Sequence, residues 1–149
     1  MEAQISPSLI IKTMVTLLAC VISGCVPTIV QRVYSGPELP KESVAIITQE
    51  CGVATAFVDE KFLPDYSQGR CGGSSLSNIR LHVLPGLHKI EVHYRGSVSL
   101  SHTISSSYPI PLEFEAKAGH TYLIHSNRRF MGRKQGYSWQ PSIEDVTGK

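Results

Sequence analysis

The sequence predicts an all-β protein, a small antiparallel β-sandwich that follows an N-terminal targeting segment. Three observations favour this class: short segments alternate apolar and polar residues, glycine and proline separate them, and no amphipathic helical pattern follows residue 25. At 149 residues the chain has room for one domain. Its 17% charged and 42% hydrophobic residues exclude a disordered chain, and a net charge of +2 argues against a nucleic-acid partner.

The strand predictions rest on hydrophobic side chains that recur at every second position. In the clearest example, Ile79, Leu81 and Val83 share one face, which predicts a strand with one buried side. Pro85 and Gly86 then occupy the two central positions of a type II turn. Eight strands are expected, over residues 43–48, 55–58, 78–83, 88–94, 98–104, 112–116, 120–126 and 139–143.

The N-terminus carries an apolar run over residues 13–22, with the sequence TMVTLLACVI. Ten residues of helix span about 15 Å, roughly half of a bilayer core, so the run is too short for a comfortable transmembrane helix. It has the length of the apolar region of a secretory signal. The four residues that end this region are Ile22, Ser23, Gly24 and Cys25.

These four residues resemble the lipobox of bacterial lipoproteins, which is aliphatic, small, small, cysteine. The resemblance implies that the Cys25 thiol takes up a diacylglyceryl group and that cleavage leaves Cys25 as an acylated N-terminus. Val26 after the cysteine then implies the outer membrane of the bacterial cell envelope, with the membrane bound through the lipid anchor. Residues 1–24 are the expected lipoprotein signal peptide, 25–41 a tether and 42–149 the β-sandwich domain. A plain secretory signal and an uncleaved anchor are the alternatives.

Processing would leave Cys51 and Cys71 as the two thiols of the exported domain. Two remaining cysteines in an oxidising compartment most simply pair with each other, closing a loop of about 20 residues. Two buried free thiols are the alternative. Neither cysteine belongs to a CxxC pair, so we expect no metal site at these positions.

Two hairpin-like runs resemble a known group of surface domains. Residues 84–94, LPGLHKIEVHY, are similar to the hairpins of PEGA-like domains. Residues 114–124, FEAKAGHTYLI, look like the closing hairpin of small bacterial lipoproteins that carry the same first hairpin. The resemblance implies a PEGA-like or transthyretin-like β-sandwich and no particular chemistry, because fold does not give function.

The sequence offers no set of catalytic residues, no metal ligands and no cofactor motif. It contains neither HExxH nor Gly-x-Ser-x-Gly. Among the six histidines, we expect His88 to be largely buried and hydrogen-bonded, and His120 to cap backbone groups beside a turn. A site formed by histidines that meet only in space stays open as an alternative.

The concentrated charge of the chain lies in residues 128–134, RRFMGRK. Phe130 and Met131 lie between the positive charges, and aromatic residues beside arginine are typical of binding surfaces. We therefore predict a contact surface for an anionic envelope component or an acidic protein partner. Its basic residues are Arg128, Arg129, Arg133 and Lys134. The alternative is a solvated loop with Phe130 folded inward.

Together these observations predict a membrane-anchored envelope lipoprotein that acts as a non-enzymatic structural or binding module. The second candidate is an inhibitor or accessory subunit of an envelope enzyme. That reading rests on a likeness to lysozyme-inhibitor lipoproteins, which are also small, disulfide-bonded and rich in β-strands.

Overall fold

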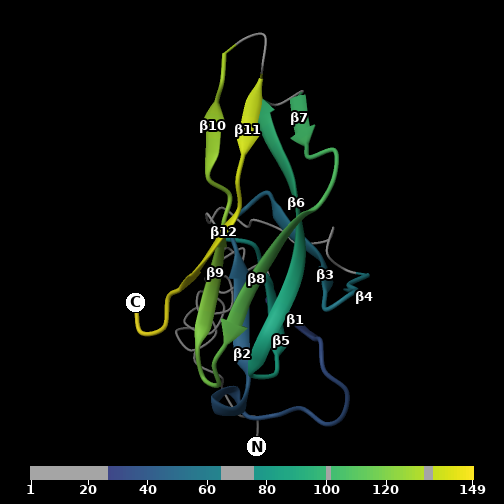
Figure 1. Ribbon diagram of the computed structural model, residues 1–149, viewed down its shortest axis with the longest axis vertical. Helices are drawn as coiled ribbons and strands as arrows, with labels where there is room; N and C mark the ends of the chain where they lie inside the picture. The colour runs from purple at the N-terminus through teal and green to yellow at the C-terminus, as the bar shows by residue number, and fades with distance from the viewer. Residues whose placement is uncertain (1–26, 65–75, 100–101, 133–135) are drawn as a thin grey trace, which may run out of the picture.

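The computed structural model describes residues 27–64, 76–99, 102–132 and 136–149, and this part of the chain is all-β, as predicted (Figure 1). One 3-10 turn, η1 (Lys41–Ser43), precedes β2. The expected signal peptide and the residues Cys25, Cys71, Arg133 and Lys134 lie outside the described residues. No helix in the described ranges is long and apolar enough to cross a membrane. The strands are β1 (Ile29–Arg32), β2 (Ala45–Gln49), β3 (Val53–Val58), β4 (Lys61–Phe62), β5 (Ile79–Val83), β6 (Gly86–Ser99), β7 (His102–Ser105), β8 (Ile110–Ala116), β9 (Thr121–His125), β10 (Arg128–Phe130), β11 (Tyr137–Trp139) and β12 (Ser142–Asp145).

The first sheet has the strand order β1-β5-β2-β9-β12 and is mixed. β2 is antiparallel to β5, and β12 is antiparallel to β9. β1 runs parallel to β5, and β2 runs parallel to β9. The expectation of purely antiparallel sheets therefore needs correction at these two pairs. Alternation predicts which side chains face the core, but it is the same in both kinds of ladder, so it does not distinguish them.

The second sheet is built around the 14-residue strand β6. On one edge β6 pairs with β3, which in turn pairs with β4. The first half of β6 also pairs with β8 and its second half pairs with β7. Strands β6, β7 and β8 thus form one long hairpin.

The two sheets share one hydrophobic core. The largest side chains that are fully buried include Ile47, Ile79 and Ile124 from the first sheet and Ile90 from the second. Each such side chain contributes about 1.5–3 kcal/mol relative to an exposed one. Phe114 and Tyr122 come from opposite sheets, and their ring centroids lie 5.1 Å apart inside this cluster.

The β-domain begins earlier than the sequence suggested, because β1 lies inside the segment 25–41 that we expected to be a tether. Ile29 N–H donates to the carbonyl of Asn78 at 2.9 Å, and the Asn78 side chain donates to the carbonyl of Pro27 at 2.7 Å. The short pattern around Val30 and Gln31 carries little strand signal, and it forms a strand because the edge of β5 is available to pair with it.

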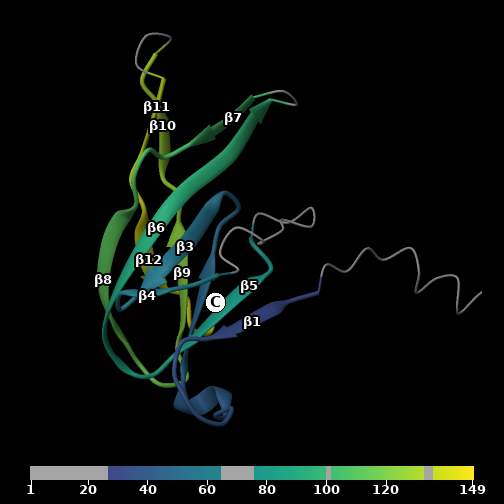
Figure 2. The same cartoon turned by 90° about the vertical axis from the view of Figure 1, so that its right-hand side faces the viewer.

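Two hairpins extend beyond the sandwich at the same end of the molecule. The end of β6 and β7 make the first arm, and β10 and β11 make the second arm. The second arm continues the β9–β12 pair in the same register, with a break at Asn127, which has a φ of 31°. Figure 2 shows that the two arms separate above the sandwich.

Candidate functional site

A groove of about 480 Å³ lies between the two arms. Residues 104–108 and Ile110 line it from the side of the first arm, and residues 136–139 line it from β11. Tyr94 and Arg128 complete the lining. The described residues of this lining comprise four aromatic side chains, two isoleucines, four serines, one glycine and one charged residue, which is a suitable composition for a binding site.

Three side chains stack at one end of the groove. The ring centroids of Tyr94 and Trp139 lie 5.6 Å apart, and the Arg128 guanidinium carbon lies 5.2 Å from the centroid of the Tyr94 ring. The second distance is within the range of a cation–π contact. Arg128 and Trp139 face each other across β10 and β11, so the strand register brings the cation and the rings together.

Two glycines make room for the Tyr94 ring. A Cβ atom on Gly96 would lie 1.9 Å from the Tyr94 hydroxyl oxygen and 2.5 Å from its Cζ atom. A Cβ atom on Gly52, whose φ is 89°, would lie 2.9 Å from Tyr94 Cε2. The Tyr94 ring therefore lies close against the backbone of its own strand at Gly96 and forms part of the groove wall.

The variant Gly96→Ala is expected to displace the Tyr94 ring and to destabilise the protein by about 1–3 kcal/mol, as overpacking usually does. Urea unfolding measures the loss, and the fluorescence of Trp139 reports the change beside it, since Trp139 is the single tryptophan. In a Tyr94→Ala background, Gly96→Ala should lower the free energy of unfolding much less. Equal costs in the two backgrounds would contradict the described packing.

The structure divides the predicted basic surface. Arg128 and Phe130 lie on the same face of β10 as Tyr137 and Trp139, because they are their cross-strand neighbours. Arg129 lies on the opposite face. The side chain of Phe130 is 57% exposed and packs on Tyr137 with ring centroids 5.1 Å apart, so it does not fold into the core. No ion pair with Arg128 or Arg129 occurs among the described residues.

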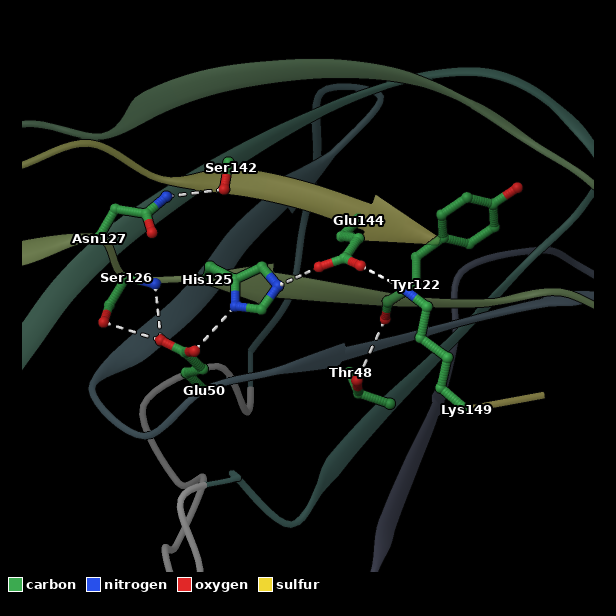
Figure 3. A network of polar contacts seen from close by, with 9 residues as sticks. All are labelled: Thr48, Glu50, Tyr122, His125, Ser126, Asn127, Ser142, Glu144 and Lys149. Carbon is green, nitrogen blue, oxygen red and sulfur yellow. Dashed lines mark hydrogen bonds and ion pairs between the residues drawn. The ribbon is translucent and has the colours of Figure 1, made fainter. Parts of the chain in front are cut away.

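A second polar cluster joins Glu50, the residue after β2, to residues of β9 and β12 (Figure 3). His125 Nδ1 lies 2.8 Å from Glu50 Oε1, and its Nε2 lies 3.1 Å from Glu144 Oε2. The other oxygen of Glu50 accepts hydrogen bonds from the N–H and the hydroxyl of Ser126 at 2.8 and 2.9 Å. Glu144 also pairs with Lys149.

This cluster has the geometry of a structural clamp. The hydroxyl of Ser126 donates to the Glu50 carboxylate, whereas an activated nucleophile would donate to the imidazole. Both nitrogens of His125 face carboxylates, which favours the charged imidazolium. The clamp lies directly before Asn127, where the second arm leaves the sandwich, and so it fixes the base of that arm.

The two ends of the clamp titrate in opposite directions. The hydrogen bond with Glu50 raises the pKa of His125 above 6.5, against partial burial, with a further contribution from Glu144. Burial opposes ionisation of Glu50, but the hydrogen bonds from Ser126 and His125 outweigh it and lower its pKa below 4.5.

Clamp stability is therefore expected to be greatest between about pH 4.5 and pH 6.5. The contribution of His125 is complete below its unfolded pKa and is lost as the pH rises through the raised folded value. The contribution of Glu50 is present above its unfolded pKa and is lost as the pH falls through the lowered folded value. Urea unfolding should give a lower free energy of unfolding at pH 8.5 than at pH 5.5, because the His125 contribution is lost. The variant His125→Gln should remove this difference between the two pH values. An unchanged difference in the variant would assign it to other groups.

Two other histidines also hold loops. His88, as predicted, is largely buried: its Nδ1 lies 2.5 Å from Asp59 Oδ2, and its Nε2 donates to the Leu84 carbonyl at 2.7 Å. His120 differs from expectation, because its Nδ1 contacts the carboxylate of Asp145 at 2.7 Å rather than a backbone group. The Thr147 hydroxyl, and then His120, hold the pKa of Asp145 well below its usual range. Within the described ranges no three His, Cys, Asp or Glu residues are placed to hold a metal ion.

Sequence reasoning found one side of the groove and missed the other. It identified Arg128 with its neighbouring aromatic residues, but not Tyr94, Tyr108 or the serines 105–107. In the sequence, Tyr94 looks like an ordinary core position of an alternating strand. The one signal that distinguishes it is Gly96, two residues later, which leaves room for its ring. Comparison with known protein families, with characterised proteins and with solved structures finds no match to this chain. The PEGA-like resemblance stays a prediction.

Proposed function

We propose that the protein is a lipid-anchored, non-enzymatic binding module of the bacterial envelope that holds an anionic partner between its two arms. The observation that carries this proposal is the groove, which joins exposed aromatic surface to Arg128. Tyr108 is 72% exposed and Tyr137 is 47% exposed, and large exposed aromatic residues around one groove are characteristic of interaction sites.

The proposed anchor would hold the domain close to the bilayer. Cys25 precedes Ile29, the first residue of β1, by four residues. A fully extended chain covers at most about 3.6 Å per residue, so the acylated cysteine would lie within about 14 Å of the sheet edge. Partners at the membrane surface, such as lipopolysaccharide, lie within reach of a domain tethered this closely.

We propose no enzymatic role, because the clusters of carboxylates and histidines have structural roles. The carboxylates of Asp59, Asp145, Glu50 and Glu144 each contact a histidine that links two segments of the chain. These contacts account for the paired acids and imidazoles as structural ties, and they lie outside the lining of the groove.

The second candidate, an inhibitor or accessory subunit of an envelope enzyme, is favoured by the tip of the second arm. Phe130 is 57% exposed and Met131 is 46% exposed on a hairpin that projects beyond the sandwich. A projecting hairpin with apolar residues is able to enter the cleft of another protein. This candidate predicts that binding depends on Phe130 and Met131 more than on the walls of the groove.

The test uses residues 25–149 with Cys25→Ser, so that the lipid does not itself cause retention. We expect the domain to be retained on anionic liposomes, lipopolysaccharide vesicles or peptidoglycan, and retention to weaken as salt rises. Charge reversal of the basic surface should abolish it without loss of folded stability. The four substitutions are Arg128→Glu, Arg129→Glu, Arg133→Glu and Lys134→Glu.

A matched control reverses four exposed charges on the body of the domain, which changes the net charge equally. Those substitutions are Arg32→Glu, Lys41→Glu, Lys89→Glu and Lys117→Glu. The control should keep its binding. Equal loss in both variants would mean that net charge alone causes retention, and no retention of the parent domain on any of the three surfaces would refute the proposal.

A further inference from the structure

The groove is bordered by the edges of strands. Successive side chains of a strand point to opposite faces, so a groove over a strand face is lined by every second residue. Here consecutive strand residues line it on both sides, Ile104 and Ser105 at the end of β7 and Tyr137–Trp139 on β11, and residues 106–108 of the bend after β7 continue the lining. Such runs are the mark of a backbone edge that faces the opening.

The strand register identifies which backbone groups point into the groove from β11. Met131 N–H donates to the Gly136 carbonyl, and Gln140 N–H donates to the Asn127 carbonyl. Hydrogen-bonded positions alternate in an antiparallel pair, so Gly136, Ser138 and Gln140 direct their backbone groups toward β10. Tyr137 and Trp139 direct their N–H and C=O groups away from β10, to the edge that lines the groove.

The first arm offers a matching edge. Ser106 N–H donates to the Tyr94 carbonyl at 2.8 Å, which makes residues 94 and 106 a hydrogen-bonded position of the β6–β7 hairpin. Ser105 lies opposite Arg95 at the next position, so its backbone N–H and C=O point away from β6. Among the described residues, β7 and β11 therefore each leave one strand edge unpaired beside the same groove.

We propose that an extended acidic peptide segment binds in this groove as an added strand on β11. This inference rests on the proposed binding function and specifies the class of partner. Main-chain hydrogen bonds to Tyr137 and Trp139 supply the ladder, as in other cases of strand addition. Among the described residues that line the groove, Arg128 is the single charged side chain and none is a carboxylate, so Arg128 selects acidic side chains. A polyhydroxylated glycan fits less well, because the described part of the lining offers neither carboxylates nor carboxamides to its hydroxyl groups.

The test measures Trp139 fluorescence while an eight-residue peptide of alternating aspartate and valine is added to the Cys25→Ser domain. The single tryptophan lies in the groove, so binding there changes its emission directly. Arg128→Gln should weaken binding about tenfold, the effect of losing one charge-assisted contact. Lys117→Gln, which removes an exposed charge on the body of the domain, should leave it nearly unchanged. Equal losses in the two variants would overturn the proposal.

Amide hydrogen exchange then distinguishes strand addition from other binding. The peptide should slow exchange at Tyr137 and Trp139 and leave Ser138, whose N–H points to β10, unchanged. The same peptide with every backbone nitrogen methylated should fail to bind. Equal binding of the methylated peptide, or protection absent from both aromatic amides, would overturn strand addition. If polygalacturonate or lipopolysaccharide changes Trp139 emission and the peptide does not, the inference fails while the proposed function stands. If none of these probes binds, both fail.

Discussion

The variant Cys25→Ser is expected to release the protein from the membrane completely. Without the thiol no diacylglyceryl group is attached, so the proposed lipid anchor is lost. The measurement is fractionation of cells that make the full chain, followed by intact mass. Parent protein should sediment with the membrane and carry acyl mass, and the variant should be found in the soluble fraction.

Cys20→Ser serves as the control for this experiment. Cys20 lies within the apolar run that the expected cleavage removes, so its replacement should change neither mass nor location of the mature protein. A Cys25→Ser variant that still sediments with the membrane, together with a parent that gains no acyl mass, would refute lipidation.

Removal of the predicted Cys51–Cys71 bridge should lower the free energy of unfolding by about 3 kcal/mol, the chain-entropy value for a loop of about 20 residues. Cys51 is disulfide-bonded in the structure, and its predicted partner lies outside the described residues. Cys51 lies between Glu50 of the clamp and Gly52, whose carbonyl accepts a hydrogen bond from the N–H of Arg95 next to Tyr94. The loss should therefore also loosen the base of the groove.

The double variant Cys51→Ser/Cys71→Ser, compared with the parent in urea unfolding, measures this effect. Intact mass after alkylation without reductant provides the chemical control. Two alkylated cysteines in the denatured, unreduced mature protein would rule the bridge out, and unchanged stability in the double variant would show that it contributes nothing.

Alternation along the chain was sufficient to predict most of the strands. Ile79, Leu81 and Val83 face the core from β5, and Ile90 and Val92 do so from β6. This succeeds because burial of one face is a local property of each strand. The pairing of β1 with β5, and of β2 with β9, joins segments far apart in sequence, and no local pattern encodes that choice.

The groove was beyond sequence reasoning for the same reason. Arg128 and Tyr94 are 34 positions apart in the sequence, and they meet because the two long hairpins leave the sandwich at the same end. The clamp likewise joins Glu50 to His125 across 75 positions. The sequence identified a basic, aromatic segment, but the other wall of the groove is brought beside it only by the fold.

Site-specific photo-crosslinking in intact cells is the most direct measurement of whether the arms hold the partner. A photoreactive phenylalanine analogue at Tyr108, 72% exposed in the groove, is compared with one at Leu87, 75% exposed at the other end of β6. We predict an adduct from position 108 that Arg128→Glu removes, and none from position 87. Adducts of equal yield from both positions, or an adduct at 108 that persists with Arg128→Glu, would contradict binding between the arms.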